Sequence, residues 1–111
     1  MNDVNLAEVE TIGDAAFQKC IKLKRITITK YVTIIGKNAF YGCKKLKTIK
    51  IKTEKLTNSN IGKNAFKGIY KKAKFTVPST KLAEYKKILK KKGLPSKATI
   101  KKYKSLLAHG S

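Results

Sequence analysis

The sequence contains few acidic residues, two cysteines, one histidine and no tryptophan. Its 6 Asp and Glu residues are outnumbered by 27 Lys and Arg, and they are scattered or close to the N-terminus. Two cysteines are too few for a disulfide framework, and with one histidine they form no zinc-binding pattern. The glycines do not have the spacing of a phosphate-binding loop. We therefore expect a protein that is not an enzyme and that has no cofactor and no metal site.

Long apolar segments are absent as well. No stretch is long and apolar enough to span a membrane, and no basic head followed by an apolar run marks a secretion signal. We expect no membrane insertion, and if the protein is exported its signal lies outside this chain. A length of 111 residues, of which 41% are hydrophobic, allows one small domain with a modest core.

Positive charge is abundant and unevenly distributed. The formal net charge is +21. Residues 1–18 contain four carboxylates and no basic residue, so this segment has a charge of −4. All 27 basic residues follow it, with only Glu54 and Glu84 among them, which gives the rest of the chain +25. Such a charge attracts polyanions without selecting among them.

One short sequence pattern, "IGxxAF", occurs three times in the chain. "IGDAAF" occupies residues 12–17, and "IGKNAF" occupies residues 35–40 and again 61–66. The spacings are 23 and 26 residues, so about three residues are inserted between Glu54 and Asn60. A period of this length indicates stacked units, each of which forms one coil of a solenoid.

Each coil has two predicted parts. Alternating apolar and polar residues predict short parallel strands at 24–29, 47–52 and 73–77. The segments that begin at the repeated glycine predict a turn followed by one helical turn, which Gly42 and Gly68 end with positive φ. We expect three phenylalanines to stack in the core, and we expect the two cysteines, which hold equivalent places in adjacent coils, to be buried free thiols. These residues are Phe17, Phe40 and Phe66, and Cys20 and Cys43.

The pattern "IGxxAFxxC" plus "LKxIxI", at residues 12–28 and 35–51, resembles the BspA-like leucine-rich repeats of bacterial and protist surface proteins. The third coil keeps "IGKNAF" but has Ile69 in place of the cysteine and Lys72 in place of the leucine. The resemblance covers about residues 4–78 and implies an α/β leucine-rich-repeat solenoid. It also implies a secreted or cell-surface protein whose repeats mediate adhesion or bind extracellular or host proteins.

The C-terminal part of the sequence predicts a cap. We expect about three coils over residues 1–78 and a cap over 79–104, which consists of a helix at 79–92 and a short strand at 98–101. Ser79 or Thr80 is the predicted N-cap, and Gly93 suits the position just past the helix. Residues 105–111 form a tail that is either natural or vector-derived.

The outward side of the predicted strands is the candidate binding surface. Cations and threonines should alternate along each row across the sheet, and like charges would then not face each other. Avoidance of repulsion explains this pattern by itself, but such a face also suits an acidic glycan or an acidic protein patch. The candidate residues are Arg25, Thr48 and Lys74 in one row, Thr27, Lys50 and Thr76 in the next, and Lys52, beside Thr29, in the third.

Two other functions stay open at this point. The chain could be a structural end-cap of a longer solenoid, or a nonspecific binder of polyanions such as glycans or nucleic acid. Specific nucleic-acid binding is not expected, because the five tyrosines are dispersed and no basic recognition helix is evident. We also expect no patterned strand upstream of the strand at 24–29, so that its upstream edge is open. Either the N-terminal segment folds over this edge or two molecules join edge to edge, which predicts a monomer or weak edge-to-edge self-association.

Overall fold

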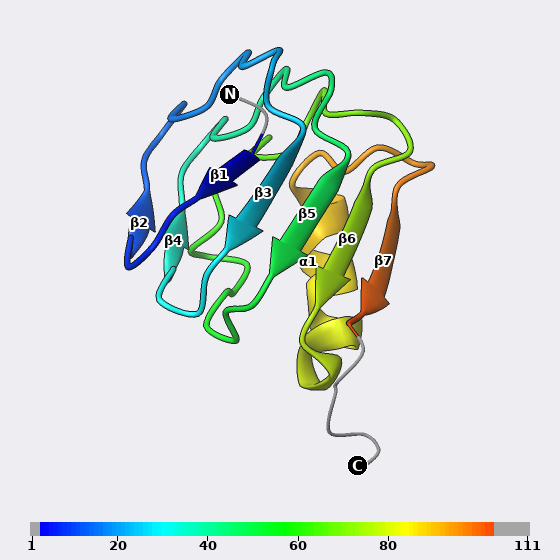
Figure 1. The fold of residues 1–111 in the computed structure, drawn as a ribbon. Coiled ribbons are helices and arrows are strands. Elements are labelled where there is room, and N and C mark those ends of the chain that lie inside the picture. The colour runs from blue at the N-terminus through cyan, green and yellow to red at the C-terminus, as the bar shows by residue number, and fades with distance from the viewer. Residues whose placement is uncertain (1–2, 104–111) are drawn as a thin grey trace.

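The computed structural model describes residues 3–103 (Figure 1). Five parallel strands form one sheet in the order β1-β3-β5-β6-β7, and β2 and β4 form a second, two-stranded parallel sheet. One helix, α1, lies on the same side of the large sheet as the turns. The elements are β1 (Asp3–Asn5), β2 (Thr11–Ile12), β3 (Arg25–Ile28), β4 (Ile34–Ile35), β5 (Thr48–Ile51), β6 (Lys74–Val77), the 3₁₀ helix η1 (Ser79–Lys81), α1 (Leu82–Lys91) and β7 (Thr99–Lys102).

The three predicted strands are confirmed as β3, β5 and β6. Each has a buried residue at every second position, as the alternation of apolar and polar residues requires. Ile26 pairs with Ile49, and Ile49 pairs with Phe75, so equivalent residues of successive coils lie side by side. The repeated sequence therefore sets the register of the sheet.

The upstream edge of the first predicted strand is not open, because the N-terminal segment folds over it, which was one of the two expected outcomes. Strand β1 pairs in parallel with β3 and places Val4 beside Ile26. Leu6, just after β1, is buried in the core. A strand at Asp3–Asn5 was not predicted, because three residues are too few to show the alternation that marks the other strands.

The predicted one-turn helices are also absent. Residues 13–20, 36–43 and 62–69 consist of successive turns. A left-handed residue, which is Ala15, Asn38 or Asn64, interrupts each segment two positions after the glycine. Amides in these segments alternate between a carbonyl of their own turn and a carbonyl of the next coil. A helix would have needed all of those amides for itself.

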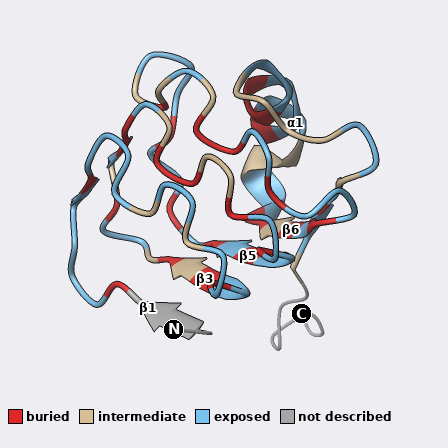
Figure 2. Ribbon diagram, turned by 90° about the horizontal axis from the view of Figure 1, so that it is seen from above, coloured by how far each residue is buried: buried red, intermediate tan, exposed pale blue. Residues whose placement is uncertain are grey.

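The predicted phenylalanine column is confirmed. The ring centroids of Phe17 and Phe40 lie 5.3 Å apart with the planes at 1°, and those of Phe40 and Phe66 lie 5.3 Å apart at 11°. Phe75 of β6 closes the column edge-on against Phe66 at the same distance. Phe40, Phe66 and Phe75 of this column are buried, and Figure 2 shows buried residues along both the strands and the turn segments.

Helix α1 closes the downstream end of the core with Tyr85, Ile88 and Leu89. The predicted N-cap was wrong, since no side chain caps η1 or α1. The hydroxyl of Thr80 instead donates to Glu54 Oε1 at 2.9 Å. Gly93 follows the helix with φ 94°, as predicted, and the amide of the next residue bonds back to the carbonyl of Leu89 at 3.4 Å.

The segment after β6 also continues the stacking. The amide of Phe66 donates to the carbonyl of Lys92 at 3.1 Å, which is the bond that Phe40 makes to Ala65 in the next coil. Strand β7 then pairs with β6 and sets Ile100 beside Phe75. The predicted strand at 98–101 therefore exists, one residue later than expected.

Both cysteines are free thiols, but only Cys43 is buried. Its Sγ donates to the carbonyl oxygen of Phe17 at 2.9 Å. Desolvation by burial raises the pKa of the Cys43 thiol to about 11. The predicted burial of Cys20 was wrong, since this residue is half-buried in the outermost turn segment.

Candidate interaction surface

The outer face of the large sheet contains the predicted rows of cations and threonines. In the first row Arg25 pairs with Thr48, which in turn pairs with Lys74. In the second row Lys50 lies between Thr27 and Thr76. The parallel register places equivalent positions of successive coils side by side. The rows alternate because the residue at each of these positions is a cation in one coil and a threonine in the next.

Both rows extend one strand further than the sequence predicted. Thr99 of β7 pairs with Lys74, and Lys101 pairs with Thr76. Cations and threonines therefore alternate over four strands, β3, β5, β6 and β7, in both rows. The signal was present in "ATIKKY", but a cap strand was not expected to continue the face of the repeats.

The third row is less regular. Lys52 is exposed, and its amide donates to the carbonyl of Ile28 at 2.8 Å, which continues the β3–β5 ladder. The hydroxyl of Thr29 is buried and has no hydrogen-bond partner among the described residues. Lys52 is therefore available to a ligand on this face, whereas the hydroxyl of Thr29 is not.

The cations of the sheet face are exposed and regularly spaced. Arg25, Lys50, Lys74 and Lys101 are exposed, and Thr27 and Thr76 between them are half-buried. Neighbouring strands lie about 4.8 Å apart, so cations of one row are separated by about 10 Å. Threonine hydroxyls, which donate and accept hydrogen bonds, occupy the intervening positions.

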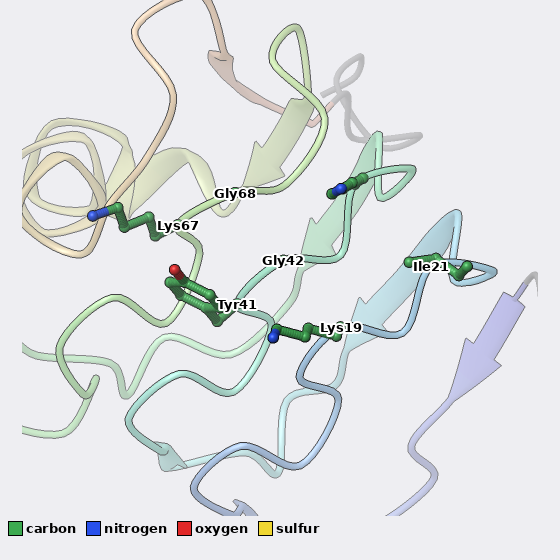
Figure 3. Close-up of a pocket in the computed structure, with 7 residues that line it drawn as sticks. Lys19, Ile21, Tyr41, Gly42, Lys67 and Gly68 are labelled. Carbon is green, nitrogen blue, oxygen red and sulfur yellow. The ribbon is translucent and has the colours of Figure 1, made fainter.

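A recess of about 530 Å³ lies on the turn side of the molecule (Figure 3). Its floor contains Gly42 and Gly68, which occupy equivalent places in adjacent coils with φ 75° and 80°. A Cβ on Gly68 would approach the backbone nitrogen of Gly42 to 3.1 Å, so no side chain fills this column. The recess is lined by Lys19, Ile21, Tyr41, Gly42, Lys44, Lys67 and Gly68.

Sequence reasoning treated these glycines as turn residues and missed the recess that they leave. Glycine at the same place in two successive coils was the available signal. The lysines and the tyrosine around the recess could meet an anionic group. They are exposed or half-buried surface residues, however, and no buried polar side chain points to a defined ligand here.

Within residues 3–103, no group of three or more His, Cys, Asp and Glu residues could hold a metal ion. No helix in the same part of the chain has the length and apolar character needed to cross a membrane.

Comparison with known families identifies the repeat. The family model of the BspA type leucine-rich repeat region, which has six copies, matches residues 1–99. No curated protein and no solved structure matches the chain. Leucine-rich repeats generally mediate protein–protein interaction or adhesion. The match covers most of the 111 residues, and the chain belongs to the BspA-type leucine-rich repeat family.

Proposed function

We propose that the chain is a non-catalytic interaction module of a surface or secreted leucine-rich-repeat protein. In this proposal the stacked coils form a short solenoid, and the outer face of the large sheet binds an acidic partner. Repeat proteins use extended faces of this kind to bind other molecules. In this role the cations of the sheet contribute to binding as well as to solubility.

The observation that supports it most is the alternation of cation and threonine over four strands. Avoidance of like charges would be met equally well by uncharged residues at every position. The face instead keeps a cation on each of β3, β5, β6 and β7, and these side chains are exposed. A carboxylate or sulfate that meets a cation here also finds hydroxyl donors on the neighbouring strands.

The partner in this proposal is an acidic glycan or the acidic patch of an extracellular or host protein. Both present several negative charges over a distance comparable with the width of the sheet. Charge–charge attraction would accelerate encounter, and it would be weakened by salt.

A pair of charge-reversal variants tests the proposal. Lys50→Glu with Lys52→Glu changes the sheet face, and Lys86→Glu with Lys87→Glu changes the exposed side of α1. Each pair lowers the formal net charge from +21 to +17. Binding to a sulfated glycosaminoglycan should weaken at least about tenfold more in the sheet variant, which corresponds to about 1.4 kcal/mol.

The outcome separates the proposal from nonspecific attraction. Equal losses in both variants would show that only net charge matters and would overturn the sheet-face site. Far-ultraviolet circular dichroism and thermal melting establish that both variants remain folded, so that a loss of binding is not a loss of structure.

A second candidate function is that of an end-cap for a longer solenoid. The observation that favours it is the bond from the amide of Phe66 to the carbonyl of Lys92, together with the pairing of β7 on β6. Residues 79–102 thus cover both the turn side and the sheet side of the third coil. Terminal repeats need such covers to protect their apolar faces.

A further inference from the structure

The turn segment of the first coil is exposed where its equivalents are buried. Ala16 is exposed, whereas Ala39 and Ala65 at the same position have no accessible surface. Phe17 is half-buried, whereas its equivalents in the second and third coils are fully buried. We call the side of residues 13–20 that faces away from the second coil the upstream turn face.

Several backbone carbonyls at this face accept no hydrogen bond from the part of the chain that the structure describes. Between coils, alternate amides of one turn segment donate to carbonyls of the next. In the first interface these bonds run from Ala15, Phe17 and Lys19 to Lys37, Ala39 and Tyr41. The equivalent acceptors of the first coil are Asp14, Ala16 and Gln18, and among the described residues none of these three carbonyls accepts a hydrogen bond. The upstream turn face therefore offers a ladder of acceptors.

Gly13 supplies an independent observation. A Cβ on Gly36 would lie 2.4 Å from the backbone nitrogen of Asp14, and one on Gly62 would lie 2.3 Å from that of Lys37. Both glycines are needed because the backbone of the preceding coil touches them. A Cβ on Gly13 would meet nothing within 4 Å, although Gly13 holds the same position in its coil.

On the sheet side of the first coil, strand β1 already covers the upstream edge of β3. Asp3 of β1 pairs with Arg25, as Thr48 of β5 does on the other side. Strand β1 thus lies where the strand of a preceding coil would lie. We infer that the upstream turn face is a docking surface for the turn segment of one further BspA-type coil, held in register with β1.

The geometry and charge of this surface favour such a segment over a second copy of the chain. Two upstream turn faces would oppose carbonyls to carbonyls. The downstream end of a copy is covered by α1 and β7, and the amide of Phe66 there is already bonded. The carboxylate of Asp14 accepts a hydrogen bond from the amide of Lys37 at 2.9 Å and so faces the second coil. Glu8 and Glu10, which precede the turn segment, are exposed, and a segment such as residues 32–47, with four lysines and no carboxylate, complements their charge. Two copies with a net charge of +21 also repel each other.

The test adds a segment of this type to the chain. A copy of residues 32–47 replaces Asn2, so that it leads directly into Asp3 in the register that Thr48 has after the original. The melting temperature should rise by at least about 5 °C, because new apolar surface is buried in a small domain. A Gly/Ser extension of the same length should leave it unchanged.

Gly13 provides the matched variant. Gly13→Ala should leave the melting temperature of the present chain unchanged, whereas Gly36→Ala should lower it strongly. In the extended chain Gly13→Ala should cancel most of the rise in melting temperature, because the new Cβ would then contact the backbone of the added segment. No stabilisation by the segment, or a Gly13→Ala variant that is tolerated in the extended chain, would overturn the inference. If the present chain instead formed a dimer as its concentration rose, and Gly13→Ala abolished that dimer, the inference would also be overturned, because the face would then bind a second copy. None of these readouts depends on ligand binding by the sheet.

Discussion

The hydroxyl group of Tyr85 donates to the carbonyl oxygen of Thr53 at 2.8 Å. The same hydroxyl oxygen accepts a hydrogen bond from the amide of Leu56 at 3.2 Å. Thr53 has no accessible surface, and its own hydroxyl donates to the carbonyl of Val32 at 2.7 Å. One phenol therefore fixes α1 to the connection between the second and third coils, and it satisfies two buried backbone groups there.

Tyr85→Phe should accordingly destabilise the protein by about 1–3 kcal/mol, since it leaves a buried carbonyl and a buried amide without a partner. Urea unfolding followed by circular dichroism measures the change. Tyr70→Phe is the control, because Tyr70 is exposed and should change the stability by less than about 0.5 kcal/mol. If Tyr85→Phe matched this control, the hydroxyl would not anchor the helix.

The phenylalanine column predicts a graded response to truncation. Phe40 is fully buried between two stacked rings, so Phe40→Ala should cost about 3–5 kcal/mol. Phe17→Ala should cost clearly less, because Phe17 is half-buried and stacks on one ring only. Thermal or urea unfolding of the two variants compares them. Equal losses would contradict the position of Phe17 at the end of the column.

The repeat allowed most of the fold to be predicted from the sequence. Ile26 and Ile49 each belong to a segment in which apolar and polar residues alternate. The fixed period of the repeat aligns these two segments in only one way. The pairing of Thr27 with Lys50 follows from the same period. The role of the sheet face in binding stays a prediction.

The features that could not be predicted depend on single contacts, and single contacts produce no repeating pattern in the sequence. Ala15 adopts a left-handed conformation, which alanine disfavours, because bonds to the second coil require it. In the sequence Tyr85 cannot be distinguished from the other residues on the apolar face of an amphipathic helix. The two backbone groups to which its hydroxyl bonds lie about 30 residues earlier in the chain. Strand β1 has only three residues, and it is recognised by its pairing with β3.

The two thiols should differ in reactivity. Cys20 is half-buried in the outermost turn segment, whereas Cys43 is buried and has a pKa raised to about 11 by desolvation. Because the thiolate is the reactive form, a maleimide or disulfide reagent at pH 8 should label Cys20 well before Cys43. Mass spectrometry of a time course gives both rates. Equal rates, or a mass that indicates a disulfide, would contradict the structure.

Alkaline pH should destabilise the folded chain through two buried acids. Desolvation raises the pKa of Cys43 from 9.0 to about 11 and that of Tyr85 from 10.0 to about 12. The folded state then retains protons that the unfolded state releases, so these groups reduce stability as the pH rises from about 9 to about 12. Urea midpoints between pH 8 and pH 11 measure the slope. Cys43→Ala should make the fall shallower from pH 9 upward, and Tyr85→Phe from pH 10 upward.

The last prediction concerns the order of charges on the sheet. Exchanging two residues of β5, by Thr48→Lys together with Lys50→Thr, keeps the composition and the net charge of +21. It would place a third cation between Arg25 and Lys74 and leave three threonines in the second row. Two new like-charged neighbours should each cost about 0.2–1 kcal/mol at low salt. The loss should shrink as added salt shortens the Debye length to about 3 Å at 1 M.

Binding of the same variant separates the two explanations of the alternating rows. If the alternation serves only to avoid repulsion, the exchanged protein should be less stable at low salt, and its affinity for a sulfated glycosaminoglycan should be unchanged once it is folded. If the face binds its partner through cations with hydroxyls between them, the affinity should also fall at equal net charge, because no hydroxyl remains between the cations of the first row. Titration at a salt concentration where both proteins are fully folded measures the affinity without interference from unfolding. An unchanged or higher affinity under those conditions would count against the sheet-face site, even though the register of the strands stayed the same.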